Sequence, residues 1–208
     1  MKLPEPALLL ITDRLQAKLP LPEIMENACA AGCRWLSLRE KDLAAAEQIV
    51  LAHDLLPIAR RWGARLTLHG DAKLARKAGV DGVHLPAGSD VRAARTLLGS
   101  EKIFGISIHT VAEAKTLDPA LVDYAIAGPA YETASKPGYG PALGAAGIAA
   151  IASAAAVPIL AIGGITADAV GPMLNTGAAG VAVMGAVMRA NAPGVEIERL
   201  IAALADSR

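Results

Sequence analysis

The sequence predicts a single (β/α)8 barrel, the TIM-barrel class of α/β folds, over residues 1–208, and three observations predict it. Eight short apolar runs recur along the chain, separated by longer amphipathic stretches. The runs are continuously apolar, as strands are when helices cover a parallel sheet. The first run leads into Asp13-Arg14-Leu15-Gln16, so it lacks the glycine-rich fingerprint of a dinucleotide-binding sheet. Eight units in one rhythm favour a barrel over the alternative, an open flavodoxin-like or Rossmann sheet.

The expected elements follow in chain order. The strands are expected at Leu8–Thr12, Trp35–Arg39, Arg65–His69, Gly82–Leu85, Ile103–Ile108, Tyr124–Ala127, Pro158–Ile162 and Gly180–Met184. The helical stretches between them include Leu21–Ala31, Leu43–Trp62, Asp71–Ala78, Val91–Leu98 and Ala145–Ala155. Glycines at positions 32, 63, 79 and 177 stand where such helices end, because glycine adopts the left-handed cap conformation at little steric cost.

Composition excludes several classes of function. The chain is 53% hydrophobic and 19% charged, with a formal net charge of +0, which argues against broad binding to nucleic acid or to anionic membranes. No apolar stretch is long enough to span a membrane, and the first apolar run is too short for a signal peptide, so we expect a cytoplasmic protein. Cys29 and Cys33 are four residues apart on a helical pattern and are interpreted as core residues rather than a metal or redox pair.

The second predicted strand ends in charged residues. Barrel enzymes place their active sites at the C-terminal ends of the strands. Ser37, Arg39 and Lys41 alternate to one side if the strand geometry continues, which brings two cations to the barrel mouth. Arginine offers a planar fork and lysine a mobile charge for an anionic ligand. The alternative is that both cations are ordinary solvated surface charges.

The ends of the seventh and eighth strands are rich in small residues. Gly163 and Gly164 follow the seventh strand, and Val183, Met184 and Gly185 lead from the eighth into a small-residue helix start. Loops at these two places often form a phosphate site in this fold, because glycine lets backbone N–H groups approach an oxyanion. A pair of glycines can also be a simple turn, so the combination of the two strand ends carries the prediction.

Further polar residues are expected near the same mouth. The long segment after the sixth strand carries Thr133, Ser135 and Lys136, and is either a lid over a polyanion or a solvated loop. His69 and His109 lie at or just past strand ends, whereas His53 and His84 are expected to have structural roles. The four histidines have no metal-ligand spacing.

Several motifs together carry a family resemblance. They are Ile11-Thr12-Asp13-Arg14, Leu38-Arg39-Glu40-Lys41, Asp81-Gly82-Val83-His84-Leu85, Gly105-Ile106-Ser107-Ile108-His109-Thr110, Gly128-Pro129-Ala130-Tyr131 with Thr133, Ser135 and Lys136, and Ala161-Ile162-Gly163-Gly164-Ile165. In this order, over nearly the whole chain, they resemble the thiamine phosphate synthase family. The resemblance implies a transferase that joins an aminopyrimidine diphosphate to a thiazole phosphate and releases diphosphate.

The resemblance also implies roles for individual residues. Arg39, Lys41, Ser107 and Lys136 would contact the diphosphate, and Thr133 would line the substrate site. The backbone at Gly164 and around Met184–Gly185 would hold the thiazole phosphate. Cations and a metal ion, Mg²⁺ in this family, would stabilise the charge that develops on the leaving diphosphate.

The sequence departs from the family at the metal positions. His69 and Gly70 stand where the family has Asn-Asp, and Ser89 stands at the second aspartate. Asp71 and Asp90 each lie one residue beyond and are the predicted Mg²⁺ ligands if the chain is a synthase. Mg²⁺ demands near-octahedral oxygen geometry, so a shift of one residue is a large change. Ser37 replaces a glutamine of the family that contacts the pyrimidine.

Two other interpretations remain open. Leu85-Pro86-Ala87-Gly88-Ser89 is closer to the thiazole tautomerase branch of the same superfamily, which performs a proton transfer without diphosphate chemistry. Its catalytic histidine aligns with Pro129, which cannot carry a proton, so His69 or His109 would have to substitute. The third interpretation is a non-catalytic protein that binds thiazole or thiamine phosphate. In each case the expected partner is a small phosphorylated heterocycle, with a homo-oligomer possible through alanine-rich helix faces.

Overall fold

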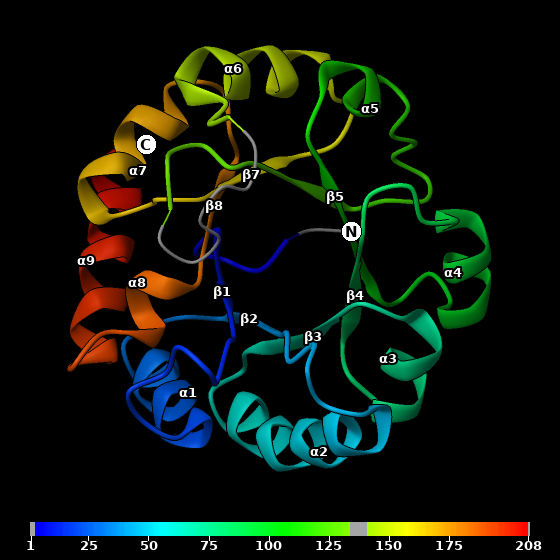
Figure 1. The fold of residues 1–208 in the computed structure, drawn as a ribbon, viewed down its shortest axis with the longest axis vertical. Coiled ribbons are helices and arrows are strands. Elements are labelled where there is room, and N and C mark those ends of the chain that lie inside the picture. The colour runs from blue at the N-terminus through cyan, green and yellow to red at the C-terminus, as the bar shows by residue number, and fades with distance from the viewer. Residues whose placement is uncertain (1–2, 134–140, 208) are drawn as a thin grey trace.

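Eight parallel strands close into a barrel in chain order, in a computed structural model that describes residues 3–133 and 141–207. A ring of helices surrounds the strands (Figure 1). The strands are β1 (Leu8–Ile11), β2 (Trp35–Leu38), β3 (Arg65–His69), β4 (Gly82–Leu85), β5 (Ile103–Ile108), β6 (Tyr124–Ala127), β7 (Ile159–Ile162) and β8 (Gly180–Val183). The helices are α1 (Leu21–Ala30), α2 (Ala45–Arg61), α3 (Ala72–Ala78), α4 (Val91–Leu98), α5 (Val111–Lys115), α6 (Gly144–Ala154), α7 (Ala167–Leu174), α8 (Gly185–Met188) and α9 (Pro193–Asp206). The predicted barrel is confirmed.

The expected strands agree with the structure to within one residue at each end. β3, β4, β5 and β6 coincide with their predicted ranges. β1, β2 and β8 end one residue earlier than expected, because Thr12, Arg39 and Met184 already belong to the loops at the mouth. β7 begins after Pro158, which has no N–H to give to the strand ladder. No bounds were predicted for α5, α7, α8 or α9.

Strand alternation divides the apolar core into two parts. Outward-facing side chains such as Leu8 and Leu10 pack against the helices. Inward-facing side chains fill the barrel itself, and the cluster comprises Leu9, Ile11, Trp35, Ile103, Tyr124, Ile126, Leu160 and Ala182. Leu3, which precedes β1, packs against this inner cluster. The barrel is therefore a packed core that gives the mouth a solid floor.

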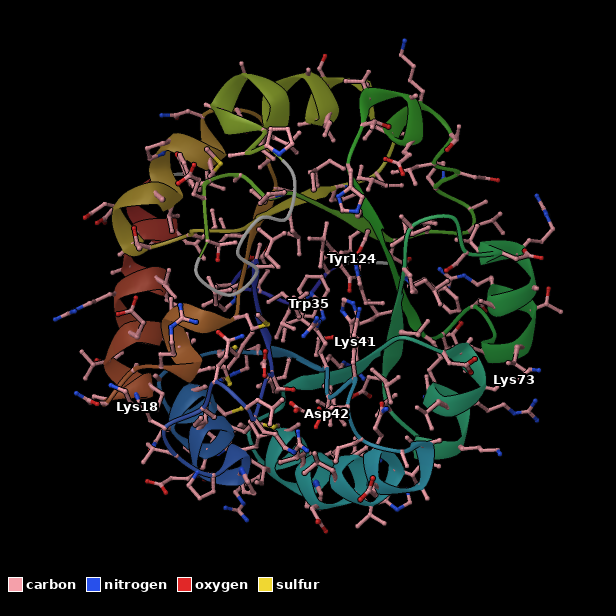
Figure 2. The ribbon with its side chains drawn as sticks, viewed as in Figure 1. Lys18, Trp35, Lys41, Asp42, Lys73 and Tyr124 are labelled. Carbon is pink, nitrogen blue, oxygen red and sulfur yellow. The ribbon has the colours of Figure 1, made fainter. Side chains whose placement is uncertain are left out.

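Two aromatic rings dominate this floor. Trp35 and Tyr124 meet edge to face, with ring centroids 4.6 Å apart at 74°, and both lie near the middle of the barrel in Figure 2. Gly105 on β5 leaves space for the phenol, since a Cβ there would lie 2.1 Å from Tyr124 Cζ. A larger residue at position 105 would displace the ring.

Cys29 and Cys33 are free, buried thiols, as expected of core residues. Burial raises the pKa of Cys29 to about 12 and that of Cys33 to about 11, so neither is a reactive thiolate near neutral pH. In the described part of the chain, no helix is both long and apolar enough to cross a membrane.

Candidate active site at the barrel mouth

The C-terminal ends of the strands surround a cavity of about 670 Å³. Every strand contributes a lining residue at its end or just beyond it, and these include Ile11, Arg39, Lys41, His69, His84, Ser107, Ile126, Ile162 and Ala182. This is the mouth at which the sequence analysis placed the chemistry.

Most of the predicted site residues meet in this cavity. Those that line it are Arg39, Lys41, His69, Ser107, Thr133, Gly163, Gly164, Val183, Met184 and Gly185. Ser135 and Lys136 lie outside the described residues. The functional roles assigned to the lining residues remain predictions.

Arg39 is held in place by hydrogen bonds that reach across to the end of β1. Its backbone N–H donates to Thr12 Oγ1 at 2.9 Å, and that hydroxyl donates to Glu40 Oε1 at 2.7 Å. The guanidinium lies 3.9 Å from Asp13 at its closest. Lys41 is two residues further on, and its pKa is lowered by burial and by the charge of Arg39. The two cations thus converge on one part of the cavity.

Glu40 lies between these two cations in the chain but is buried and does not line the cavity. It is 2% exposed, and it accepts hydrogen bonds from the Arg14 backbone at 3.0 and 3.3 Å. The Arg14 guanidinium lies 3.6 Å away and also pairs with Asp42. Burial raises the pKa of Glu40, although its bond from Thr12 acts in the opposite direction. Glu40 therefore joins the loop after β1 to the loop after β2 and fixes the position of Arg39.

A row of polar side chains continues around the mouth from β3 to β5. The rings of His69 and His84 stack with centroids 4.6 Å apart. His84 Nε2 lies 2.9 Å from Ser107 Oγ, and its Nδ1 lies 3.1 Å from the Tyr124 hydroxyl. Burial and the charge of Lys41 lower the pKa of His84 to about 3, so this histidine is neutral.

The loops after β7 and β8 present backbone rather than side chains. Gly163 and Gly164 have φ angles of 102° and 66°, in the left-handed region that glycine occupies readily. A Cβ on Gly164 would lie 2.7 Å from Glu132 O and from Tyr131 Cβ, so the position has no room for a side chain. Among the residues that the structure describes, the Gly164 N–H has no hydrogen-bond partner. Such a segment, beside Gly185 at the end of β8, can hold an oxyanion.

The family model described as thiamine monophosphate synthase matches residues 8–187 of this chain. The chain belongs to this family.

Relatives within the family are similar over most of their length. A Geobacter sulfurreducens protein, whose name assigns it provisionally as a thiamine-phosphate synthase, is 40% identical over 161 residues and 76% of each chain. The thiamine-phosphate synthase of Moorella thermoacetica is 36% identical over 160 residues, again 76% of each chain. The solved structure of thiamine phosphate pyrophosphorylase from Pyrococcus furiosus superposes with a TM-score of 0.85 at 26% identity, covering 96% of both chains.

This member of the thiamine monophosphate synthase family does not place its two predicted metal ligands in the cavity. Asp71 caps α3 by accepting a hydrogen bond from Leu74 N, and Asp90 caps α4 through Ala93 N, both at 2.9 Å. Neither aspartate lines the cavity. No group of three or more His, Cys, Asp or Glu side chains in residues 3–133 and 141–207 could hold a metal ion. The described residues therefore do not fit a protein-built Mg²⁺ site.

Ser37, which was predicted to contact the ligand, lies below the residues that line the cavity. The alternation of residues 37, 39 and 41 gave the correct side of β2, but Ser37 is 0% exposed and does not line the cavity. It lies deeper in the barrel than Arg39, where its hydroxyl has no hydrogen-bond partner among the described residues. Contact between Ser37 and a substrate remains a prediction.

Among the charged and aromatic lining residues, sequence reasoning gave Glu132 and Arg189 no role and gave His84 a structural one. His84 has the structural role expected of it, because its ring hydrogen-bonds to Tyr124, but the same ring also lines the cavity. His109 was placed near the mouth, and its Nδ1 lies 3.0 Å from Gly128 O. Arg189 follows the four-residue helix α8, which returns the chain to the mouth, and it hydrogen-bonds to Gln16.

Proposed function

We propose that this chain couples a thiazole phosphate to an aminopyrimidine diphosphate, forming thiamine phosphate and releasing diphosphate. The names of its relatives support this reaction. The observation that carries the proposal is that one cavity brings together two regions of different chemistry, each suited to an anion. Arg39 and Lys41 supply fixed cations after β2, and the glycines after β7 and β8 supply open backbone. Two substrates that each carry phosphate groups need two such regions.

The chemistry follows from this division. The C–O bond between the pyrimidine methylene and the diphosphate breaks, and its electron pair leaves with the diphosphate. The thiazole nitrogen then forms the new C–N bond to that methylene. Arg39 and Lys41 stabilise the charge that develops on the leaving group, in a site where preorganised charges act more strongly than in water. We assign no step to Mg²⁺, because the described residues do not by themselves build a site for it.

The test is a coupling assay with both substrates, over a range of Mg²⁺ concentrations, that measures thiamine phosphate and diphosphate together. We expect equal amounts of the two products. Arg39→Ala should reduce the rate, whereas Arg92→Ala, which removes an exposed arginine on α4, should not. Thiamine phosphate binding without turnover would contradict the synthase proposal and identify a binding protein.

A proton transfer on the thiazole phosphate is the second candidate. It is favoured by the cavity lining, which holds His69, His84 and His109 but no aspartate among the described residues. A neutral imidazole can move a proton between two ring positions without any diphosphate chemistry. Exchange of a thiazole-ring proton for deuterium would reveal this activity. His69→Gln and His109→Gln should each be tested, because loss of exchange in neither variant would contradict it.

A further inference from the structure

A chain of hydrogen bonds joins the floor of the barrel to the wall of the cavity. Tyr124 is fully buried, and its hydroxyl lies 3.1 Å from His84 Nδ1. The other ring nitrogen of His84, Nε2, lies 2.9 Å from Ser107 Oγ. Ser107 lines the cavity, so the connection ends where a ligand can reach it.

We infer that Tyr124 and His84 are positioning residues that direct the Ser107 hydroxyl proton into the cavity as a donor to an anionic oxygen of the substrate. Tyr124 O–H donates to Nδ1, and Nε2–H donates to Ser107 Oγ. Because Oγ already accepts this bond, the proton of Ser107 points elsewhere, and the cavity is the side that is open to it. The inference rests on the proposed function, which supplies phosphate or diphosphate oxygens as acceptors.

Counting protons shows which group donates and which accepts in each of these hydrogen bonds. A neutral imidazole carries one N–H, so only one of its two nitrogens can donate. The Tyr124 hydroxyl has no hydrogen-bond partner among the described residues other than His84 Nδ1. If Nδ1 carried the proton, the phenol proton would be buried without an acceptor, which is costly. The proton therefore sits on Nε2, facing Ser107.

His84 and Tyr124 keep the same protonation states across the ordinary pH range. Burial and the nearby Lys41 hold the pKa of His84 at about 3, and burial raises the pKa of Tyr124 above its usual value. Neither group changes its protonation roughly between pH 5 and 9. Lys41 thus has a second effect besides binding an anion, because its charge disfavours the imidazolium that would reverse the hydrogen bonds.

Packing keeps the phenol in place. The Tyr124 ring fits against the bare backbone of Gly105 and the edge of Trp35. Gly105 and Ser107 are both on β5, so the strand that provides space for the ring also carries the hydroxyl that the ring directs. The geometry is set by the barrel core and does not depend on a ligand.

The first test measures the tautomer directly, by nitrogen-15 NMR of the ligand-free wild-type protein, with His84→Gln to assign the signal. We expect the Nε2–H form at every pH between roughly 6 and 8, since the pKa lies far below that range. Tyr124→Phe should shift His84 toward a mixture of tautomers. An Nδ1–H form in the wild type, or a titration of His84 in this range, would overturn the inference.

The second test uses inorganic diphosphate as the probe in calorimetry, with Tyr124→Phe, Ser107→Ala and the double variant. Loss of one oriented hydrogen bond to a charged group should weaken binding about tenfold in each single variant. If Tyr124 acts through Ser107, the double variant binds no more weakly than Ser107→Ala. Additive losses would overturn the inference. A wild type that does not bind diphosphate would contradict the proposed function, and the tautomer would still decide the inference.

Discussion

The two regions of the cavity that we propose to bind anions are built in different ways. The region after β2 consists of side chains, and Arg39 keeps its position because Thr12 and Glu40 hold its backbone. The region after β7 consists of backbone, and Gly164 works because it has no side chain. Charge can therefore be removed from the first region with little change in shape. Shape can be changed in the second with no change in charge.

The largest expected effect comes from removing charge in the first region. Lys41→Ala should lower the rate of coupling by about 10²–10³-fold, because one preorganised group opposite developing charge is worth that much in comparable sites. Lys73→Ala is the matched control, since Lys73 is exposed on α3 at the rim of the molecule, whereas Lys41 lies over the barrel (Figure 2). Steady-state kinetics with both substrates would measure the difference. Equal losses in the two variants would mean that the first region has no special role.

The next effect comes from changing shape in the second region. Gly164→Ala should raise KM for thiazole phosphate about tenfold, because an L-residue at this φ is strained by about 1–2 kcal/mol and its Cβ meets the neighbouring loop. Gly79→Ala is the matched control. It has nearly the same φ, 67°, but nothing lies within 4 Å of the added Cβ, and it ends α3 away from the cavity. If diphosphate affinity falls as much as thiazole phosphate affinity, the two regions are not independent.

A smaller effect should appear in stability against pH, behind the first region. The pKa of Glu40 is raised in the folded protein, so its contribution is full below the unfolded pKa and is lost as pH rises through the folded pKa. Glu40→Gln cannot ionise. The free energy of unfolding of the wild type minus that of this variant should therefore fall as pH rises from about 4 to neutrality. Urea unfolding at several pH values measures this difference, and a rise with pH would contradict the assigned sign.

The smallest effect is expected outside both regions. Asp71→Asn and Asp90→Asn should change coupling by no more than about twofold, because asparagine caps a helix as well as aspartate does. The alanine variants should lose about 1 kcal/mol of stability from each missing cap. A large loss of activity in the asparagine variants, at unchanged stability, would show that these carboxylates bind a metal ion after all.

The sequence was informative wherever a local pattern decides the structure. Continuous apolar runs located β3 to β6 to the residue, and the alternation after β2 placed Arg39 and Lys41 at the mouth. The depth of an inward-facing residue along the barrel axis could not be predicted from such a local pattern. Ser37 and His84 both face inward, but only packing by neighbouring strands decides which of them reaches the cavity.

Glu40 shows a second kind of limit. The sequence Leu38-Arg39-Glu40-Lys41 suggests that Glu40 is one more surface charge. In the structure it is buried, and it accepts hydrogen bonds from Arg14 and Thr12, which are 26 and 28 residues away in the chain. Asp71 and Asp90 show the opposite case. Each directly precedes a predicted helical stretch or begins one, so the preference of aspartate for the N-cap was already a local signal of their role.

The aromatic floor formed by Trp35 and Tyr124 has a consequence for the order of events. With the interior of the barrel filled by this pair and its apolar neighbours, molecules that enter between the strand ends must leave by the same route. Whichever substrate lies deeper must arrive first, and whichever product lies deeper must depart last. A filled barrel thus imposes a sequence on binding and release, and product-inhibition patterns would reveal which molecule goes in first.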